Sequence, residues 1–500
     1  MTDWISGFVA IPFAAAAALA CVAAVVATSQ FTSSRQHGYF HWVIPSILII
    51  NGLIVAMSDR SIAFNGGDLV LSGDLVRDPI SAWGQRIGTM LILGVTIERL
   101  VHHFSKPGSF LGNAPALTGS FIFFWFCSIF LPMFLSAHPG FSHDRFYSLL
   151  IGVTALLLSE RDAELTMDTA RNSLFLFLLA GYALLPTHPN IVLDSNYTQG
   201  LLHGVPRFAG LAPHAVAEGM LAQLALLFVW GRPYANRRVN IAAWTLGLAT
   251  LFLAQSKTSW VSFFFCATAI YVIQHGPALR ARLTDAARPQ LAITLLLGIL
   301  LMALLVSGQA LFGHLGDRID HFLNSDEGAQ LTSLTGRDII WSVAWHEWLR
   351  NPIFGYGPSF LDESYRLSIG LPNATHGHNQ YMDLLPRAGL VGAIALTIYL
   401  VNLLILSIRH AAASRGLTLA LFVAIGLRAV SEVPLTLNGY GPEFVNQLLL
   451  LILLAAYSLK HRTVNTTSAV KNSVATATTT PVNSATPTTG ATASTLQTSP

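Results

Sequence analysis

The stretch His376-Gly377-His378-Asn379-Gln380-Tyr381-Met382-Asp383 is polar, contains two histidines and lies directly before an apolar run long enough to cross a membrane. It belongs to a chain that is 53% hydrophobic and only 11% charged. Soluble domains carry about 25% charged residues. The composition therefore predicts an integral membrane protein, and titratable groups at the edge of its membrane-embedded part are functional candidates.

Apolar runs of similar length recur from end to end of residues 1–460. A helix needs about 20 apolar residues to cross a bilayer, whereas a barrel strand needs only about 9–11. We therefore expect an all-α polytopic membrane protein with about twelve to thirteen transmembrane helices. The predicted spans are residues 8–28, 39–57, 83–103, 118–137, 145–159, 172–186, 209–230, 240–256, 259–274, 290–308, 386–407, 415–431 and 442–459.

The positions of lysine and arginine in short loops predict the orientation of these spans, because cytoplasmic loops are enriched in both. With thirteen spans, the basic connections all fall on one side, which we assign to the cytoplasm. They contain Arg161, Arg171, Arg232, Arg237, Arg238, Arg280, Arg282, Arg288, Arg409, Arg415, Lys460 and Arg462. The connections that then face outward are 187–207, the turn at Lys257, 309–385 and 432–441.

The outward loop 309–385 is far longer than ordinary connections, which makes it a functional candidate. Its tryptophans recur on one face of an expected short helix, at Trp341, Trp345 and Trp348. Pro352 ends this helix, because the residue before a proline is disfavoured in helical conformation. The tryptophan face suits sugar binding, although such faces more often pack against the core.

Other features of the composition exclude some classes of protein. A net charge of +3, spread over several loops, does not favour nucleic-acid binding. The cysteines lie in apolar runs and predict neither a disulfide nor a metal site: Cys21, Cys127 and Cys266. The tail 463–500 is rich in Thr, Ala and Ser and nearly uncharged, so we expect it to be disordered and cytoplasmic.

Two arginines are expected on the outward side. Arg207 precedes a span, and Arg337 begins the short helix of the long loop, where backbone N–H groups favour anions. Arginine makes planar, bidentate contacts to phosphate, so the pair suits a lipid-linked diphosphate. A salt bridge to Asp320 or Glu347 is an equally good interpretation of either arginine. Lys257 is a further candidate for the anion site.

His378 lies at the junction of this loop and the next span. A histidine that titrates near neutral pH can take a proton from a hydroxyl group, which makes His378 a candidate general base. A structural hydrogen bond is the alternative, and His376 competes for the same role. Two histidines at this spacing are weak evidence for a metal site.

Three ionisable residues fall inside or beside predicted spans: Glu218, Arg428 and Glu432. Such groups are functional candidates by default, because charge is costly in a membrane. Arg428 and Glu432 stand four apart, and we therefore expect them to form a neutralising ion pair along a helix.

These segments resemble the superfamily of O-antigen ligases and Wzy-type polysaccharide polymerases, whose shared region is called Wzy_C. His378-Asn379, nine residues, Gly389, two residues and Gly392 match that superfamily's histidine pattern. Residues 333–357, SLTGRDIIWSVAWHEWLRNPIFGYG, resemble its Thr-Gly-Arg block, and residues 207–219, RFAGLAPHAVAEG, its Arg-x-x-Gly-x-x-x-His segment. The resemblance covers about 200–440, and the first 200 residues by topology alone.

The resemblance implies a GT-C-like membrane fold and a metal-independent, inverting glycosyltransferase without a cofactor. It implies an undecaprenyl-diphosphate-linked oligosaccharide donor, held by Arg207 and Arg337. It also implies that His378 activates the acceptor hydroxyl. The sequence departs from the superfamily at His214-Ala215-Val216, which leaves the role of His214 open. The supporting candidates are His376, Asn379, His214, Glu218, Lys257, Arg428 and Glu432.

Three functions fit this resemblance or compete with it. A polymerase of exopolysaccharide repeat units is slightly favoured by the block at residues 333–357. A ligase that moves the glycan to lipid A-core in lipopolysaccharide synthesis is the alternative. A flippase or transporter would suit the span count, but paired broken spans in two matching halves are missing from the sequence. We expect a multi-pass protein of the bacterial inner membrane whose active site faces the periplasm, with chain-length regulator or export proteins as candidate partners.

Overall fold

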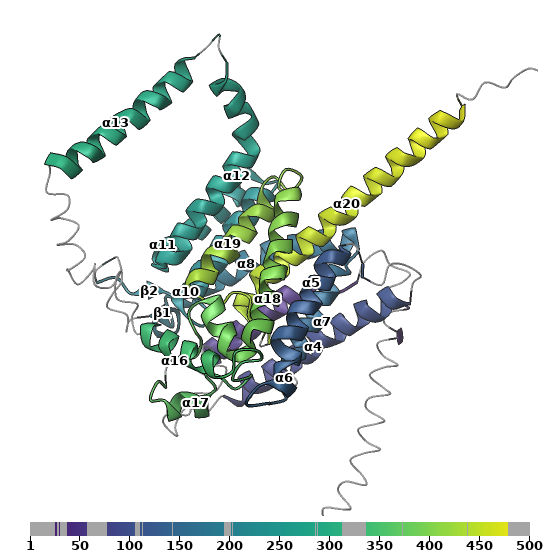
Figure 1. The fold of residues 1–500 in the computed structure, drawn as a ribbon, viewed down its shortest axis with the longest axis vertical. Helices are drawn as coiled ribbons and strands as arrows, with labels where there is room; N and C mark the ends of the chain where they lie inside the picture. The colour runs from purple at the N-terminus through teal and green to yellow at the C-terminus, as the bar shows by residue number, and fades with distance from the viewer. Residues whose placement is uncertain are drawn as a thin grey trace, which may run out of the picture. The chain divides into compact units, whose positions relative to one another are not determined.

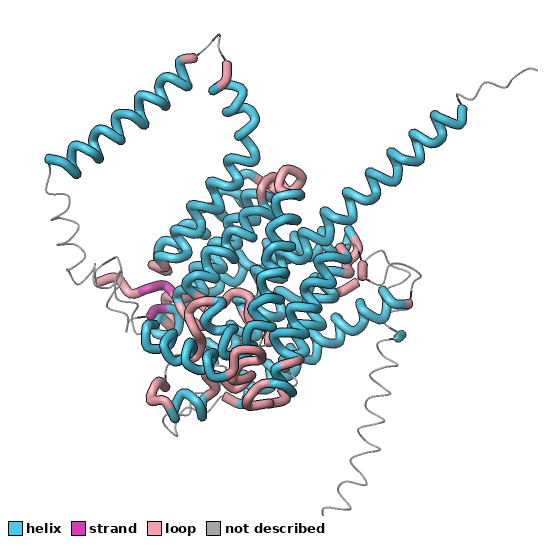
Figure 2. Tube along the Cα trace, in the orientation of Figure 1, coloured by secondary structure: helices cyan, strands magenta, loops and turns pink. Residues whose placement is uncertain are grey.

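The computed structural model describes residues 26–27, 30, 38–57, 78–105, 111–112, 114–142, 144–194, 202, 204–285, 287, 289–312, 337–372, 374–437 and 439–478. These residues are almost entirely helical (Figures 1 and 2), which confirms the all-α fold class. The chain divides into two units, residues 1–458 and 459–500. Everything described below, except the end of the last helix, belongs to the first unit.

The helices follow the predicted apolar runs closely, apart from the run 8–28, which lies almost wholly outside the described residues. In the first half they are α2 (Val43–Met57), α4 (Pro79–Phe104), α5 (Pro115–Trp125), α6 (Pro132–Leu135), α7 (Arg145–Leu156), α8 (Glu160–Leu184) and α9 (Pro189–Val192). In the second half they are α10 (Ala215–Gly231), α11 (Arg237–Leu253), α12 (Lys257–Leu283), α13 (Gln290–Phe312), α16 (Arg337–Arg350), α17 (Glu363–Ser368), α18 (Gln380–Arg409), α19 (Leu417–Ser431) and α20 (Pro442–Thr478). One short antiparallel pair, β1 (Leu193–Asp194) and β2 (Arg207–Phe208), is the only sheet among the described residues.

Five helical segments among the described residues are long and apolar enough to cross a membrane: 40–57, 115–135, 257–283, 380–409 and 442–460. Four shorter apolar helices accompany them, at 145–156, 215–231, 292–304 and 417–431. The protein is therefore a polytopic helical membrane protein, and the total of twelve to thirteen spans stays a prediction.

Helix α10 lies in the middle of the packed helices. Nearly every residue from Ala215 to Val229 is buried, in agreement with a sequence that is apolar except at Glu218 and Gln223. Helices α8, α11, α12 and α19 all pack against it, and α18 packs against α5, α16 and α19. In this core, Tyr399 of α18 stacks on Phe124 of α5 with 5.3 Å between the ring centroids.

Helix α18 is kinked where the segment after α16 docks against it. Gly389 has φ +62°, and a Cβ there would collide with the backbone of Ile353. The amide N–H groups that the kink releases are used: Leu390 donates to Pro352 O (2.8 Å) and Val391 to Ile353 O (3.2 Å). This glycine fixes the outer loop against the transmembrane helix that carries the histidine stretch.

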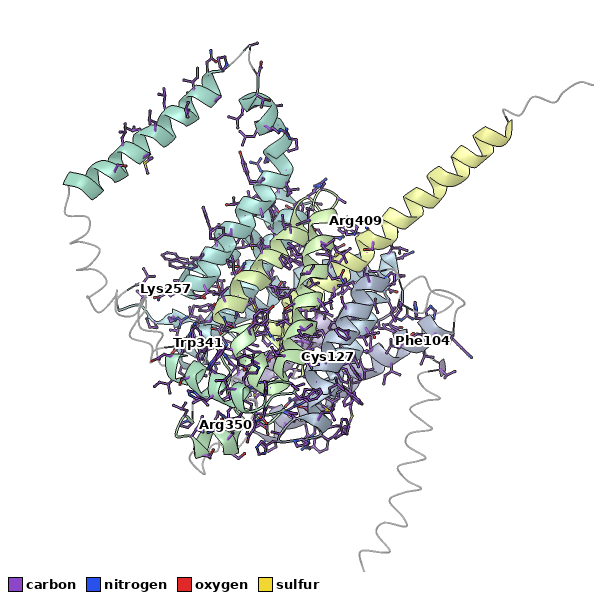
Figure 3. All side chains as sticks on the ribbon, viewed as in Figure 1. Phe104, Cys127, Lys257, Trp341, Arg350 and Arg409 are labelled. Atoms are coloured by element: carbon purple, nitrogen blue, oxygen red, sulfur yellow. The ribbon has the colours of Figure 1, made fainter. Side chains whose placement is uncertain are left out.

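The loop expected over 309–385 contains the predicted short helices. Helix α13 continues to Phe312, residues 313–336 lie outside the described residues, and α16 spans Arg337–Arg350 as the tryptophan pattern and Pro352 predict. Figure 3 shows Trp341 on α16 and Lys257 at the start of α12. Part of the expected loop is therefore helical.

Helix α20 continues further than the sequence suggests. It ends at Thr478, so the first residues of the tail expected to be disordered from 463 are helical in the structure. Between Lys460 and Pro481 the sequence contains neither glycine nor proline, so nothing terminates the helix abruptly. Residues from 479 onward lie outside the described residues.

Candidate functional site

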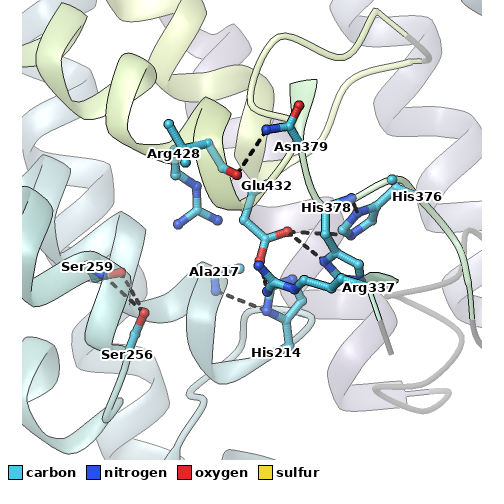
Figure 4. Close-up of polar contacts among 12 residues, drawn as sticks. His214, Ala217, Ser256, Ser259, Arg337, His376, His378, Asn379, Arg428 and Glu432 are labelled. Atoms are coloured by element: carbon cyan, nitrogen blue, oxygen red, sulfur yellow. Dashed lines mark hydrogen bonds and ion pairs between the residues drawn. The ribbon is translucent and has the colours of Figure 1, made fainter. Parts of the chain in front are cut away.

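Three segments that are distant in the sequence meet at the carboxylate of Glu432 (Figure 4). His378 Nδ1 lies 3.4 Å from Glu432 Oε2, and His376 Nε2 lies 3.6 Å from the same oxygen. Arg337 at the start of α16 reaches the other carboxylate oxygen at 3.9 Å. The cluster therefore combines the general-base candidate, its competitor and one of the two proposed phosphate-binding arginines.

The histidine loop is held in place by backbone contacts on both sides. Gly377 N donates to Asp383 Oδ1 (2.9 Å), and Trp341 Nε1 donates to Gly377 O (2.7 Å). His378 itself has φ +46°, a left-handed conformation that is uncommon outside glycine. Trp341 thus holds the histidine turn through a hydrogen bond, and His378 in this turn lies beside Glu432.

Asn379 positions this turn rather than entering the cluster. Its Oδ1 accepts hydrogen bonds from Tyr381 N (3.0 Å) and Met382 N (3.1 Å), which caps α18. Its Nδ2 donates to Val430 O (3.2 Å) near the end of α19. Asn379 therefore joins the helix that follows His378 to the helix that precedes Glu432.

The cluster has a defined charge state at neutral pH. Burial alone would raise the pKa of Glu432, but the contact with His378 and the charges of His376 and Arg428 outweigh it and hold that pKa well below its usual range. Burial, reinforced by His378, lowers the pKa of His376 to about 4. Burial, reinforced by Arg428, likewise lowers the pKa of His214 to about 3. Glu432 is therefore ionised, while His376 and His214 are neutral.

His376, His378 and Glu432 could in principle bind a divalent cation, because their ligand atoms all lie within 4.8 Å of one another. The hydrogen bonds disfavour this use. His376 Nδ1 accepts from His378 N (3.2 Å), so the neutral imidazole carries its proton on Nε2, towards Glu432. A metal-binding histidine needs the opposite tautomer, with its other ring nitrogen donating. The geometry fits an acid–base cluster better than a metal centre.

The expected ion pair between Arg428 and Glu432 is wrong. Arg428 pairs instead with Glu443 at the start of α20, with Nε–Oε2 at 3.0 Å and Nη2–Oε1 at 2.6 Å. Glu432 N still donates to Arg428 O (2.7 Å), but α19 ends at Ser431 and Glu432 has extended backbone (φ −150°, ψ −173°). The prediction assumed that the helix continues through Glu432. Glu432 is thereby available to the histidines.

The remaining candidates lie near the N-terminal ends of α10 and α12. Arg207, 7% exposed, donates from Nε to Ala254 O (3.1 Å), just before Ser256 caps α12 and Lys257 begins it. The charge of Arg207 contributes to the lowered pKa of His214, which caps α10 by accepting from Ala217 N (3.1 Å). Glu218 is fully buried against Gly210 and does not enter the cluster.

A cavity of about 590 Å³ borders the cluster, with His214, His376 and Glu432 in its wall. The sequence reasoning did not single out Asp383 and Arg387, which also line it and form an ion pair at 3.0 Å. The i,i+4 spacing of these two charges beside the histidines was the available signal.

Comparison with known proteins gives a family match for part of this chain. Residues 241–397 match the family model Wzy_C, described as O-Antigen ligase. This match confirms the resemblance of the region to the O-antigen ligase and Wzy-type superfamily and supports a membrane glycan transferase. The match contains Arg337 and His378 but ends before Glu432. A search of curated proteins found no match.

Proposed function

We propose that this protein transfers a glycan from an undecaprenyl-diphosphate carrier to a sugar hydroxyl at the periplasmic face of the bacterial inner membrane, and so polymerises surface or exopolysaccharide repeat units. The observation that carries the proposal is the approach of His378 Nδ1 to the ionised carboxylate of Glu432, at 3.4 Å. Contacts of this kind tighten when substrate binds.

The carboxylate would favour the tautomer of His378 that a general base needs. A proton on Nδ1, the ring nitrogen 3.4 Å from Glu432 Oε2, would leave the lone pair on Nε2. Nε2 takes the proton of the acceptor hydroxyl as the oxygen attacks the anomeric carbon. The imidazolium that forms is stabilised by the adjacent carboxylate, as in other base–orienter pairs.

Arg337 would assist departure of the lipid diphosphate. Its guanidinium stands at the first turn of α16, where the helix N-terminus also favours anions. As the new C–O bond forms, the bond from the anomeric carbon to the phosphate oxygen breaks, and undecaprenyl diphosphate leaves with both electrons. Arg207 and Lys257 would supply further positive charge, so the reaction requires no metal. A single displacement of this kind inverts the anomeric centre.

A ligase that transfers the glycan to lipid A-core is the second candidate, favoured by the description of the matching family model. The two activities share the same donor and the same cluster, and they differ in the acceptor. A flippase fits less well, because moving a lipid-linked glycan does not require a base–carboxylate pair at the junction of loop and span.

The acceptor can be identified with purified protein in detergent, a synthetic undecaprenyl-diphosphate oligosaccharide and EDTA. Longer lipid-linked glycans from the donor alone would support the polymerase. Product that forms only after lipid A-core is added would establish the ligase instead. Absence of product in both reactions would contradict transfer. The contribution of Arg337 is tested by comparing Arg337→Ala with Arg350→Ala. Arg350 lies on the same helix and its side chain is 72% exposed, so its replacement is the matched control.

A further inference from the structure

The cavity beside the cluster is built largely from parts of the chain that lie before and after the family match. Helix α2 contributes Asn51, α4 contributes Gln85 and Thr89, and α7 contributes Arg145 and Tyr147. The connection between α19 and α20 supplies the opposite wall, including Tyr440. At about 590 Å³, the cavity has the size of an ordinary small-ligand pocket.

The lining groups suit a ligand that is rich in hydroxyls. Amide, hydroxyl, carboxylate and guanidinium groups alternate around the wall, and each can donate to or accept from a sugar hydroxyl. The rings of Tyr147 and Tyr440 lie 6.2 Å apart, and the Tyr440 hydroxyl contacts the Thr89 hydroxyl. Tyrosine offers an apolar ring face together with a polar tip, as a sugar ring requires.

One lining group has unused hydrogen-bonding capacity. Arg366 is only 3% exposed and donates from Nη1 to Pro372 O (2.8 Å). Its Nε has no partner among the described residues. A buried donor without a partner is costly, so a small rearrangement of Arg366 towards a ligand oxygen in the cavity would be favourable.

The charges of the wall do not favour an acidic ligand. Three arginines line the cavity: Arg145, Arg366 and Arg387. Five carboxylates line it: Asp144, Asp362, Asp383, Glu432 and Glu443. Asp383 pairs with Arg387, Glu443 with Arg428 and Glu432 with Arg337. The charges of the wall are therefore largely neutralised within the protein, and no excess of positive charge is left among the lining residues to attract a polyanion.

We propose that this cavity is a binding site for uncharged sugar rings of the glycan that reacts at His378. It therefore determines sugar specificity through residues outside the family match. This inference rests on the proposed function, because the cavity is connected to the proposed catalytic cluster by its lining residues His376 and Glu432. The same chemistry could belong to the carrier-linked donor or to the acceptor.

Cysteine protection tests binding without requiring turnover. Cys127 and Cys266 are buried, so Cys21→Ser, Gln85→Cys gives one reactive thiol in the cavity. The matched control is Cys21→Ser, Asn190→Cys, on the exposed outward helix α9. Both are labelled with a membrane-impermeant maleimide, in the presence of oligosaccharide released from the host strain's own surface glycan or of trigalacturonic acid as an acidic probe.

A neutral oligosaccharide at roughly ten times its Kd should slow labelling at position 85 roughly tenfold and leave position 190 unchanged. Trigalacturonic acid should protect neither position. Equal protection by the acidic probe, or no protection by the neutral glycan in either its carrier-free or its lipid-linked form, would overturn the proposal. Protection by carrier-free glycan assigns the cavity to the acceptor, and protection by the lipid-linked donor alone assigns it to the donor sugars.

The two proposals can fail separately. In a His378→Ala background, transfer should stop while protection at position 85 persists. Normal transfer by wild type without protection would overturn the cavity assignment and leave the transferase intact. As a second readout, Gln85→Leu should raise the KM of the glycan roughly three- to tenfold with kcat nearly unchanged.

Discussion

Glu432 Oε2 lies 3.4 Å from Nδ1 of His378. Glu432 directly follows α19, whereas His378 precedes α18. This relationship depends on the extended backbone at Glu432 and on Asn379, which connects the two helices. In the proposed mechanism, this carboxylate orients His378 as the general base.

Replacement of Glu432 by glutamine should preserve the shape of the site and remove its charge. We expect kcat for glycan transfer to fall by about 10²–10⁴-fold, the usual contribution of general acid–base catalysis. Initial rates in detergent would measure this. Glu363→Gln on α17 is the control, and a Glu432→Gln enzyme as fast as that control would refute the role of the carboxylate.

The lowered pKa of His376 predicts acid sensitivity of the fold. The unfolded chain binds a proton near pH 6.5, whereas folded His376 does so only at about pH 4. Between these values the unfolded state holds more protons, so stability rises with pH. Lowering the pH from above 6.5 to below 4 should reduce the free energy of unfolding by about 2–4 kcal/mol. Melting curves in detergent should show a smaller loss for His376→Gln; identical pH profiles would contradict the assignment.

Arg337 should be needed chiefly for the lipid-diphosphate donor. Loss of its charge-assisted contacts should lower kcat/KM for the donor by about 10²-fold. Arg337→Lys should recover only part of the rate, because lysine lacks the planar fork. Steady-state kinetics with varied donor would measure both effects. If Arg337→Ala and Arg350→Ala have the same kcat/KM for the donor, Arg337 does not contribute to donor binding or departure.

Gly389→Ala should destabilise the junction of the outer loop and α18. A Cβ at φ +62° is strained by about 1–2 kcal/mol and would in addition collide with the backbone of Ile353. A lower Tm in detergent is expected. Gly94→Ala in α4 is the control, since a Cβ there meets nothing within 4 Å. Equal Tm values for the two variants would contradict the docking of the loop on the kink.

The sequence was most informative where the signal is local. Apolar runs predicted the helices, and Pro352 together with the tryptophan spacing predicted the bounds of α16. The polar stretch around His378, followed by Gly389, indicated the junction that the structure shows. Each of these signals depends on neighbouring residues and on the helical period.

Contacts between distant segments were harder to predict. Glu432 was expected to pair with Arg428 because their spacing fits a helix, but the helix ends at Ser431 and each side chain finds a partner elsewhere. The cavity was not predicted at all, since α2, α4 and α7 meet the α19–α20 connection only through tertiary packing. Residue spacing along one helix cannot encode such contacts.

The most direct test of the central claim is the initial rate of glycan transfer by His378→Ala beside His346→Ala, whose histidine is exposed on α16. Both proteins would be purified in detergent and supplied with synthetic undecaprenyl-diphosphate oligosaccharide in EDTA. If His378 is the base, its variant should lose about 10²–10⁴-fold in rate while His346→Ala stays near wild type. A His378→Ala enzyme that transfers glycan at the rate of His346→Ala would contradict the mechanism.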